Sequence, residues 1–196
     1  MNNRIGLPAL VCALASTLSA NAANVVFADN FNSNTLGRNK APIGWMVTDG
    51  TVDIIGTGFF DLQPGNGHYI DLDGSTGDAG VLSTSLSLTA GLTYTAEFSL
   101  AGNLRNAGSE TVTVSFGENQ LVYVLPSSQT FTTYSLAFAP SSSGSFALNF
   151  SNAGGDNVGA LLDNVSVTAV PEPQGMAMLL AGTLLVWFVA RHRQSC

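Results

Sequence analysis

Apolar and polar residues alternate along several segments in the middle of the chain. In residues 94–100 the apolar residues fall on one face, while Thr95, Glu97 and Ser99 fall on the other. The same alternation recurs in residues 111–116, 134–138 and 146–150. A period of two with one polar face is typical of antiparallel β-sheet, so all four segments are expected to be strands.

Further strands are expected where short apolar runs are separated by turn residues. The separating turns include Asp49-Gly50, Ala90-Gly91 and residues 64–67, 117–119 and 141–144. Many short strands at this spacing predict an all-β fold, an antiparallel β-sandwich of the jelly-roll type. The additional strands are placed near residues 25–27, 45–47, 52–55, 69–72, 81–88, 121–125 and 161–168.

The N-terminus has the three parts of a secretory signal peptide. Arg4 precedes an apolar run over residues 5–18, and Ala20-Asn21-Ala22 then gives a small-x-small cleavage pattern. We therefore expect a signal peptide at residues 1–22. The secretion machinery would export the chain, and signal peptidase would cleave it after Ala22.

The C-terminus carries a second apolar segment, which we interpret as a single transmembrane helix at about residues 174–190. The segment has no charged residue, and a helix of this length rises about 25 Å, at the short end of what crosses a hydrocarbon core. Arg191 and Arg193 follow it and are expected to hold that end in the cytoplasm. The alternative, a buried helix of a soluble domain, would show a polar stripe, which this segment lacks.

The residues on both sides of this apolar segment match a known sorting signal in order. Val170-Pro171-Glu172-Pro173 comes first, the hydrophobic span follows, and the two arginines come last. Residues 170–196 thus closely resemble the PEP-CTERM sorting signal of Gram-negative bacteria. The resemblance implies recognition in the inner membrane by an exosortase, which cuts near the Pro-Glu-Pro motif and passes the protein to the cell surface or the extracellular matrix.

The part of the chain between these two ends is strongly acidic. Residues 23–173 hold all 13 acidic residues but only Arg38, Lys40 and Arg105 as fixed cations, so their net charge is near −10. Such a domain repels nucleic acid and anionic membranes but attracts divalent cations, of which extracellular calcium is the obvious one. Both cysteines, Cys12 and Cys196, lie in the ends, so the middle is expected to have no disulfide.

Four segments of the middle resemble galactose-binding-like β-sandwich modules. The resemblance runs from about Phe31 to Val167. It implies a jelly roll that often holds a structural calcium and that displays loops for carbohydrate recognition, and it does not imply an enzyme. The segments are, in order, Gly44-Trp45 with residues 52–56, then residues 69–74, 100–103 and 162–167.

Asp163 is the principal candidate for a calcium ligand. It has the parity of Val165 and Val167 in the last expected strand, which predicts that its carboxylate points toward the core and needs a partner. In the family that the chain resembles, an acidic residue at this place can ligate calcium together with groups from the first strand, where Asp29 or Asn30 would match. The alternative is a carboxylate that holds a loop through backbone hydrogen bonds.

Asp71 and Asp73 form a second acidic motif. They lie two positions apart on an expected strand and so share a face at about 7 Å, a spacing that also suits a glycosidase pair. Three interpretations stay open: a metal-binding or hydrogen-bonding role, catalysis, or two carboxylates on a solvated face, which is the commonest case. An EF-hand is excluded because the twelfth position of the loop is Leu82.

Aromatic residues near turns are candidates for sugar binding, because sugars stack on aromatic rings while polar side chains fix their hydroxyl groups. Trp45 is expected to pack in the core, whereas Phe59 and Phe60 lie in a turn-rich stretch that favours exposure. His68 is expected at a loop tip. The candidate ligand-binding set is Trp45, Phe59, Phe60, His68, Tyr69, Asp71 and Asp73.

Together these features predict an exported, non-enzymatic β-sandwich at residues 23–169 that binds extracellular polysaccharide. Its sequence offers no cysteine nucleophile, no histidine cluster for zinc and no phosphate-binding loop. One alternative is a structural protein of a matrix or biofilm that binds no small ligand. Another is a glycoside hydrolase built on Asp71 and Asp73.

Overall fold

Eleven β-strands form the folded part of the protein. The computed structural model describes residues 24–171 and residue 182. Every strand expected from the sequence is present, and residues 24–171 contain no helix. The strands are β1 (Asn24–Asp29), β2 (Met46–Thr48), β3 (Asp53–Gly56), β4 (His68–Asp71), β5 (Val81–Leu88), β6 (Leu92–Ala101), β7 (Ser109–Phe116), β8 (Asn119–Pro126), β9 (Thr132–Phe138), β10 (Gly144–Asn152) and β11 (Leu161–Pro171).

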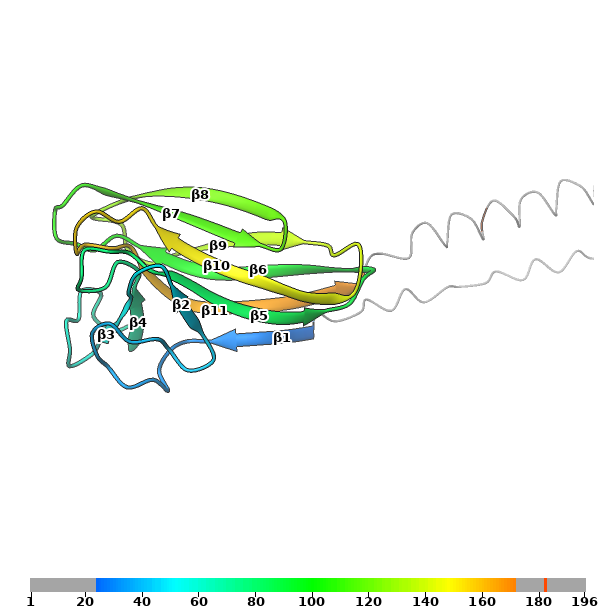
Figure 1. Cartoon of the computed structure of the whole chain (residues 1–196), viewed down its shortest axis with the longest axis horizontal. Coiled ribbons are helices and arrows are strands. Elements are labelled where there is room, and N and C mark those ends of the chain that lie inside the picture. Colours follow the sequence, from blue (N-terminus) through cyan, green and yellow to red (C-terminus); the bar gives the residue numbers. More distant parts are fainter. Residues whose placement is uncertain (1–23, 172–181, 183–196) are drawn as a thin grey trace, which may run out of the picture.

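The strands are arranged in two antiparallel sheets that pack face to face (Figure 1). Sheet A has the order β3-β4-β11-β6-β9, with β1 also paired to β11, and sheet B has the order β2-β5-β10-β7-β8. After β4 the chain crosses from one sheet to the other at every connection except the β7–β8 hairpin. The all-β antiparallel sandwich predicted from the sequence is therefore confirmed.

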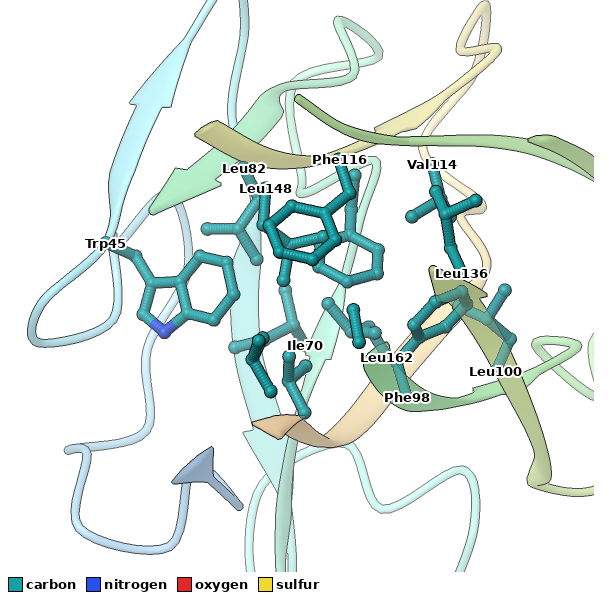
Figure 2. Packing of buried hydrophobic residues seen from close by; sticks show 14 of the residues in the cluster. Trp45, Ile70, Leu82, Phe98, Leu100, Val114, Phe116, Leu136, Leu148 and Leu162 are labelled. Carbon is teal, nitrogen blue, oxygen red and sulfur yellow. The ribbon is translucent and has the colours of Figure 1, made fainter. Parts of the chain in front are cut away.

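The inner faces of the two sheets supply one hydrophobic core. Phe98, Leu100 and Leu162 of sheet A meet Val114, Phe116 and Leu148 of sheet B (Figure 2). The period-two pattern places all of these residues except Leu162 on the core face, and all six are completely buried. Alternation thus identified the core-facing residues because each sheet has one face against the other sheet.

β11 departs from simple alternation at a bulge between Asp163 and Ser166. Leu162 and Val165 both face the core, and Asn164 between them adopts a φ of 50°. Asp163 pairs with Ser99, on the side of sheet A that faces away from the core. The prediction that Asp163 points toward the core, as Val165 does, is therefore wrong. The extra residue of the bulge shifts the alternation by one position.

One end of the sandwich holds the start of β1 and the end of β11, and the other end holds long loops. β1 begins opposite Ala169, and β11 ends opposite Leu92, so the first and last described strands meet at one end. The connections that follow β4, β6 and β10 lie at the other end, which is on the left in Figure 1. The loops of that end are consequently farthest from the points where the chain enters and leaves the sandwich.

The predicted signal peptide at residues 1–22 lies outside the described residues, as do Glu172, Pro173, Arg191 and Arg193. The expected membrane segment at about residues 174–190 lies outside them too, except for residue 182. In the part of the chain that the structure describes, no helix has the length and apolar character needed to span a membrane. Val170 and Pro171 are described and form the end of β11.

Candidate functional site

A pocket of about 260 Å³ opens at the loop end of sheet A. On β3, Ile54 belongs to the core, so Asp53 and Ile55 point to the outer side of the sheet, where the pocket lies. The other lining residues come from five separate connections of the chain. The complete lining is Arg38, Asp53, Ile55, Phe60, Gly74, Ser75, Arg105 and Asn157.

Phe60 is the exposed aromatic residue of this pocket. Its side chain is 48% exposed, and the guanidinium carbon of Arg38 lies 4.8 Å from the centre of its ring. Phe59 packs edge-on against it, with 4.8 Å between the ring centres, and is itself held against the small buried cluster around Ile55 and Tyr69. Phe59 therefore anchors the loop, and Phe60 presents a ring to the solvent.

Backbone strain accumulates in the segments around the pocket. Phe60 has a φ of 49°, and Leu104, next to Arg105, has a φ of 57°. Bulky residues other than glycine rarely adopt such values, which cost about 1–3 kcal/mol each and persist where the surroundings impose them. Such strain is commonest at functional sites, and here it positions Phe60 and Arg105.

Asp53 joins two of the lining segments. One carboxylate oxygen accepts a hydrogen bond from the backbone N–H of Asn39 at 2.7 Å, and the other accepts one from the Ser75 hydroxyl. The side chain is only 5% exposed, so these donors supply the partners that a buried carboxylate requires. Asp53 thus fixes the Arg38 segment relative to the 72–80 loop.

Arg105 holds two further loops together. It donates a hydrogen bond to the Asn157 carbonyl at 2.8 Å and forms an ion pair with Asp71 at 3.2 Å. Burial raises the pKa of Asp71 to about 7, although the neighbouring Arg105 charge acts in the opposite direction. The pair lies at the pocket wall, with the Arg105 side chain 32% exposed and Asp71 buried.

Asp73 lies directly behind this wall and is completely buried. Neither of its carboxylate oxygens has a hydrogen-bond partner among the described residues. Burial, together with the charges of Asp156 and Glu110, raises its pKa to about 6. A Cβ added to Gly159 would approach within 2.8 Å of the Asp73 Cβ, so only glycine fits beside it.

The solvated-face interpretation of Asp71 and Asp73 is therefore wrong. β4 ends at Asp71, and Asp73 lies beyond it in a turn. The backbone N–H of Asp73 donates a hydrogen bond to an Asp71 carboxylate oxygen at 3.2 Å. A hydrogen-bonding role is confirmed for Asp71. A glycosidase pair must reach its substrate from two exposed carboxyl groups, and the buried oxygens of Asp73 do not meet this requirement.

Three other candidates have structural roles. Trp45 packs in the core, as expected, and its indole N–H donates to Asp29 at 2.8 Å. Tyr69 is fully buried, and its hydroxyl donates to Asp61, so it offers no face to a sugar. His68 begins β4 rather than a loop tip, and one of its ring nitrogens lies 3.0 Å from the Asn34 carbonyl oxygen.

The predicted calcium ligands lie away from this pocket, and they do not all line one site, because Asp163 is not part of the second pocket that Asp29 and Asn30 line. Asp29 pairs with Val165, two residues after Asp163, and a second pocket is lined by Asp29, Asn30 and Asn164 among others. Burial raises the pKa of Asp163 to about 6, and the Asp29 charge adds to this rise. Asn164 donates to both Asp163 carboxylate oxygens, at 2.6 and 3.0 Å. The described residues contain no group of three or more His, Cys, Asp or Glu side chains placed to hold a metal.

Five pocket residues were not predicted from the sequence: Arg38, Asp53, Ser75, Arg105 and Asn157. They are separated by as much as 119 positions, and no motif connects them. One signal was available, because Arg38 and Arg105 are two of only three cations between residues 24 and 171. Cations that are so scarce in an acidic domain are candidates for a specific site.

The chain belongs to the DUF642 family, which is described as a family of proteins of unknown function. The family model matches residues 23–168, which include all of β1–β10 and most of β11. None of the curated proteins compared with the chain matches it.

Solved structures of similar fold include xylan-binding modules. One is the structure of the CBM22-1 and GH10 modules of Clostridium thermocellum xylanase 10B, complexed with xylohexaose. It shares 15% identity with this chain, and the match covers 78% of this chain and 30% of the other, at a TM-score of 0.52. The CBM22-1 xylan-binding domain of Paenibacillus barcinonensis Xyn10C shares 14% identity over 79% of this chain and 100% of the other, at 0.50.

A cleaved adhesin domain of Lys-gingipain from Porphyromonas gingivalis is similar to the same degree. It shares 11% identity over 72% of this chain and 96% of that domain, at a TM-score of 0.51. At such identities the likeness establishes the two-sheet sandwich fold that these proteins have in common.

The buried carboxyl groups predict an unusual pH dependence of stability. The pKa values of Asp71 and Asp73 lie above the ordinary 3.8, so the folded protein takes up protons as the pH falls from about 7 to about 4. The free energy of unfolding should therefore rise as the pH is lowered through this window. Asp73→Asn should raise it by about 3 kcal/mol at pH about 8 and change it little at pH about 3, where the carboxyl group is protonated in both the folded and the unfolded state.

Thermal and urea unfolding of both proteins at the two pH values would measure this difference. Asp49→Asn, which removes an exposed carboxylate, is the matched control and should have little effect at either pH. If Asp73→Asn instead destabilises the protein at pH about 8, Asp73 has a stabilising partner as a carboxylate, and the prediction is wrong.

Proposed function

We propose that residues 23–169 are a non-catalytic module with a jelly-roll topology that binds extracellular polysaccharide in the pocket beside Phe60. The observation that carries this proposal is the exposed Phe60 ring, held under strain in a pocket whose walls are polar and charged. Sugar-binding sites combine an aromatic face with a few fixed polar groups in this way. The fold that the chain shares with xylan-binding modules adds support.

The position of the pocket suits a protein attached or released through its C-terminus. The pocket lies at the loop end of the sandwich, and β11 ends at the opposite end. A domain held at residue 171 would therefore present the pocket away from its attachment point. This arrangement leaves the site accessible to a long polymer.

A structural protein without a small ligand is the second candidate. β8 is an edge strand of sheet B, and its Leu121, Val122 and Val124 side chains are 44%, 56% and 65% exposed. Exposed apolar edge strands are suited to pairing between molecules. Assembly that depends on protein concentration, without polysaccharide binding, would favour this candidate.

Phe60→Ala is expected to weaken polysaccharide binding at least about tenfold, because it removes the stacking surface. The protein should be tested by affinity electrophoresis against a panel of polysaccharides that includes xylan, followed by calorimetry on those that bind. Val124→Ala truncates a similarly exposed side chain on sheet B and should leave binding unchanged. Binding that Phe60→Ala does not alter would place the site elsewhere, and no binding by the unaltered protein would refute the proposal.

We also propose a structural calcium ion at Asp29, Asn30 and Asp163. The donor set fits calcium in its chemistry, since the groups are oxygen donors and the two carboxylates are close enough to repel each other. Asp163 is 2% exposed and receives hydrogen bonds only from its neighbour Asn164, so its negative charge is otherwise unbalanced among the described residues. Backbone carbonyl groups would have to complete the coordination.

Calcium should raise the midpoint of thermal unfolding relative to chelator, because a ligand that binds only the folded state stabilises it. Asp163→Asn should remove most of this shift, whereas Asp49→Asn should preserve it. Calorimetric titration with calcium would give the stoichiometry directly. An equal shift in both variants would indicate diffuse binding to the acidic surface rather than the proposed site.

We also propose a route of delivery. A signal peptide exports the chain, which is then held transiently in the inner membrane. An exosortase of the Gram-negative host cleaves it there, and the module ends on the cell surface or is secreted. The support comes from the order of the motif, the apolar span and the arginines in residues 170–196. In an exosortase-containing host, Glu172→Ala should change the mass of the mature protein measured by mass spectrometry. An unchanged mature mass would contradict exosortase processing.

A further inference from the structure

The few cations of the folded domain are concentrated at the pocket. Residues 24–171 contain 12 acidic residues and three fixed cations, which gives a net charge near −9. Two of the three cations, Arg38 and Arg105, line the pocket beside Phe60. The third, Lys40, lies in the same segment as Arg38 but is not part of the lining.

Arg38 is available to a ligand. Its side chain is exposed, it stacks over the Phe60 ring, and it has no ion-pair or hydrogen-bond partner among the described residues. Stacking on an aromatic face leaves the N–H groups at the edge of the guanidinium plane free to donate. An arginine in this position can bind a carboxylate or sulfate through two parallel hydrogen bonds.

The negative groups of the pocket are already occupied. Asp53 accepts hydrogen bonds at both oxygens, from Asn39 and Ser75. Asp71 is 2% exposed and pairs with Arg105 behind the wall. The unpaired charge that faces the opening is therefore the positive charge of Arg38, although the domain around it is acidic.

We propose that this pocket selects acidic polysaccharides, with an anionic substituent of the sugar bound by Arg38 and the sugar ring stacked beside it on Phe60. The proposal rests on the polysaccharide-binding function argued above and names its ligand class. The net charge of the domain repels anionic polymers at long range, so their binding requires a specific contact of this kind. Non-specific attraction does not explain such binding.

The test is a comparison of matched polymers and matched variants. Polygalacturonate and alginate would be compared with their carboxyl-reduced forms, which have neutral sugars, and a sulfated galactan would be compared with its desulfated form. Binding would be measured by affinity electrophoresis and calorimetry with a calcium chelator present, so that calcium cannot bridge two anionic groups. The variants are Arg38→Gln and Lys40→Gln, which change the net charge equally.

We expect an acidic polymer to bind and its neutral counterpart to bind at least about tenfold more weakly, as loss of a charge-assisted contact implies. Arg38→Gln should weaken binding of the acidic form by a similar factor, while Lys40→Gln should not. Because Arg38 is exposed, the unfolding temperature of Arg38→Gln should equal that of the unaltered protein. The carboxylate and sulfate arms of the panel identify which anion is preferred.

The inference on charge can fail separately from the proposed function. Equal affinity for acidic and neutral forms, lost in Phe60→Ala but not in Arg38→Gln, would overturn acidic selectivity and leave polysaccharide binding intact. Equal effects of Arg38→Gln and Lys40→Gln would also overturn it, since they would reflect net charge alone. Absence of binding to every polymer would overturn both proposals.

Discussion

The central position of β11 in sheet A is the constraint on which the site depends. One edge of this strand pairs with β6, and the other pairs first with β4 and then with β1. The change of partner falls near the bulge at Asp163–Ser166, where the strand also changes which residues face the core. β4 and β1 therefore occupy successive parts of one edge, and the connections around β3 and β4 are held at the loop end, where the pocket forms.

Polar contacts join the loops of the loop end to one another, in addition to the apolar packing that anchors Phe59. Asp53 ties the Arg38 segment to the 72–80 loop, while Arg105 ties the 102–108 loop to Asn157 and Asp71. Each contact joins segments that are far apart in the sequence, and each places a charged or polar group at the pocket. The same hydrogen bonds thus give the loops their shape and the site its composition, which is how a rigid scaffold usually carries a binding surface.

The strands were predictable from the sequence because alternation is a local property of the chain. Phe98 and Phe116 could be assigned to the core from their nearest neighbours alone. The side of the sheet that Asp163 faces could not be predicted, because the bulge depends on the pairing with β6. The pocket could not be predicted either, because Arg38 and Arg105 are 67 positions apart. Of the predicted ligand-binding set, only Phe60 lines the pocket, while Tyr69 is buried by a loop whose path the sequence does not reveal.

The loop end is also where the chain departs most from the rules that favour stability. Phe60 and Leu104 hold strained backbone conformations, and Asp73 is buried without a hydrogen-bond partner among the described residues. In the sheets the core-facing sides are apolar, and the register shifts only at the bulge of β11 and between Val25 and Phe27 in β1. Local conflicts of this kind weaken a fold and persist where binding or chemistry requires them. They are therefore expected to gather at functional sites. Phe31, a core residue with a φ of 56°, lies outside the pocket lining, but Phe60, Leu104 and Asp73 all belong to segments around one pocket, which is a further reason to place the function there.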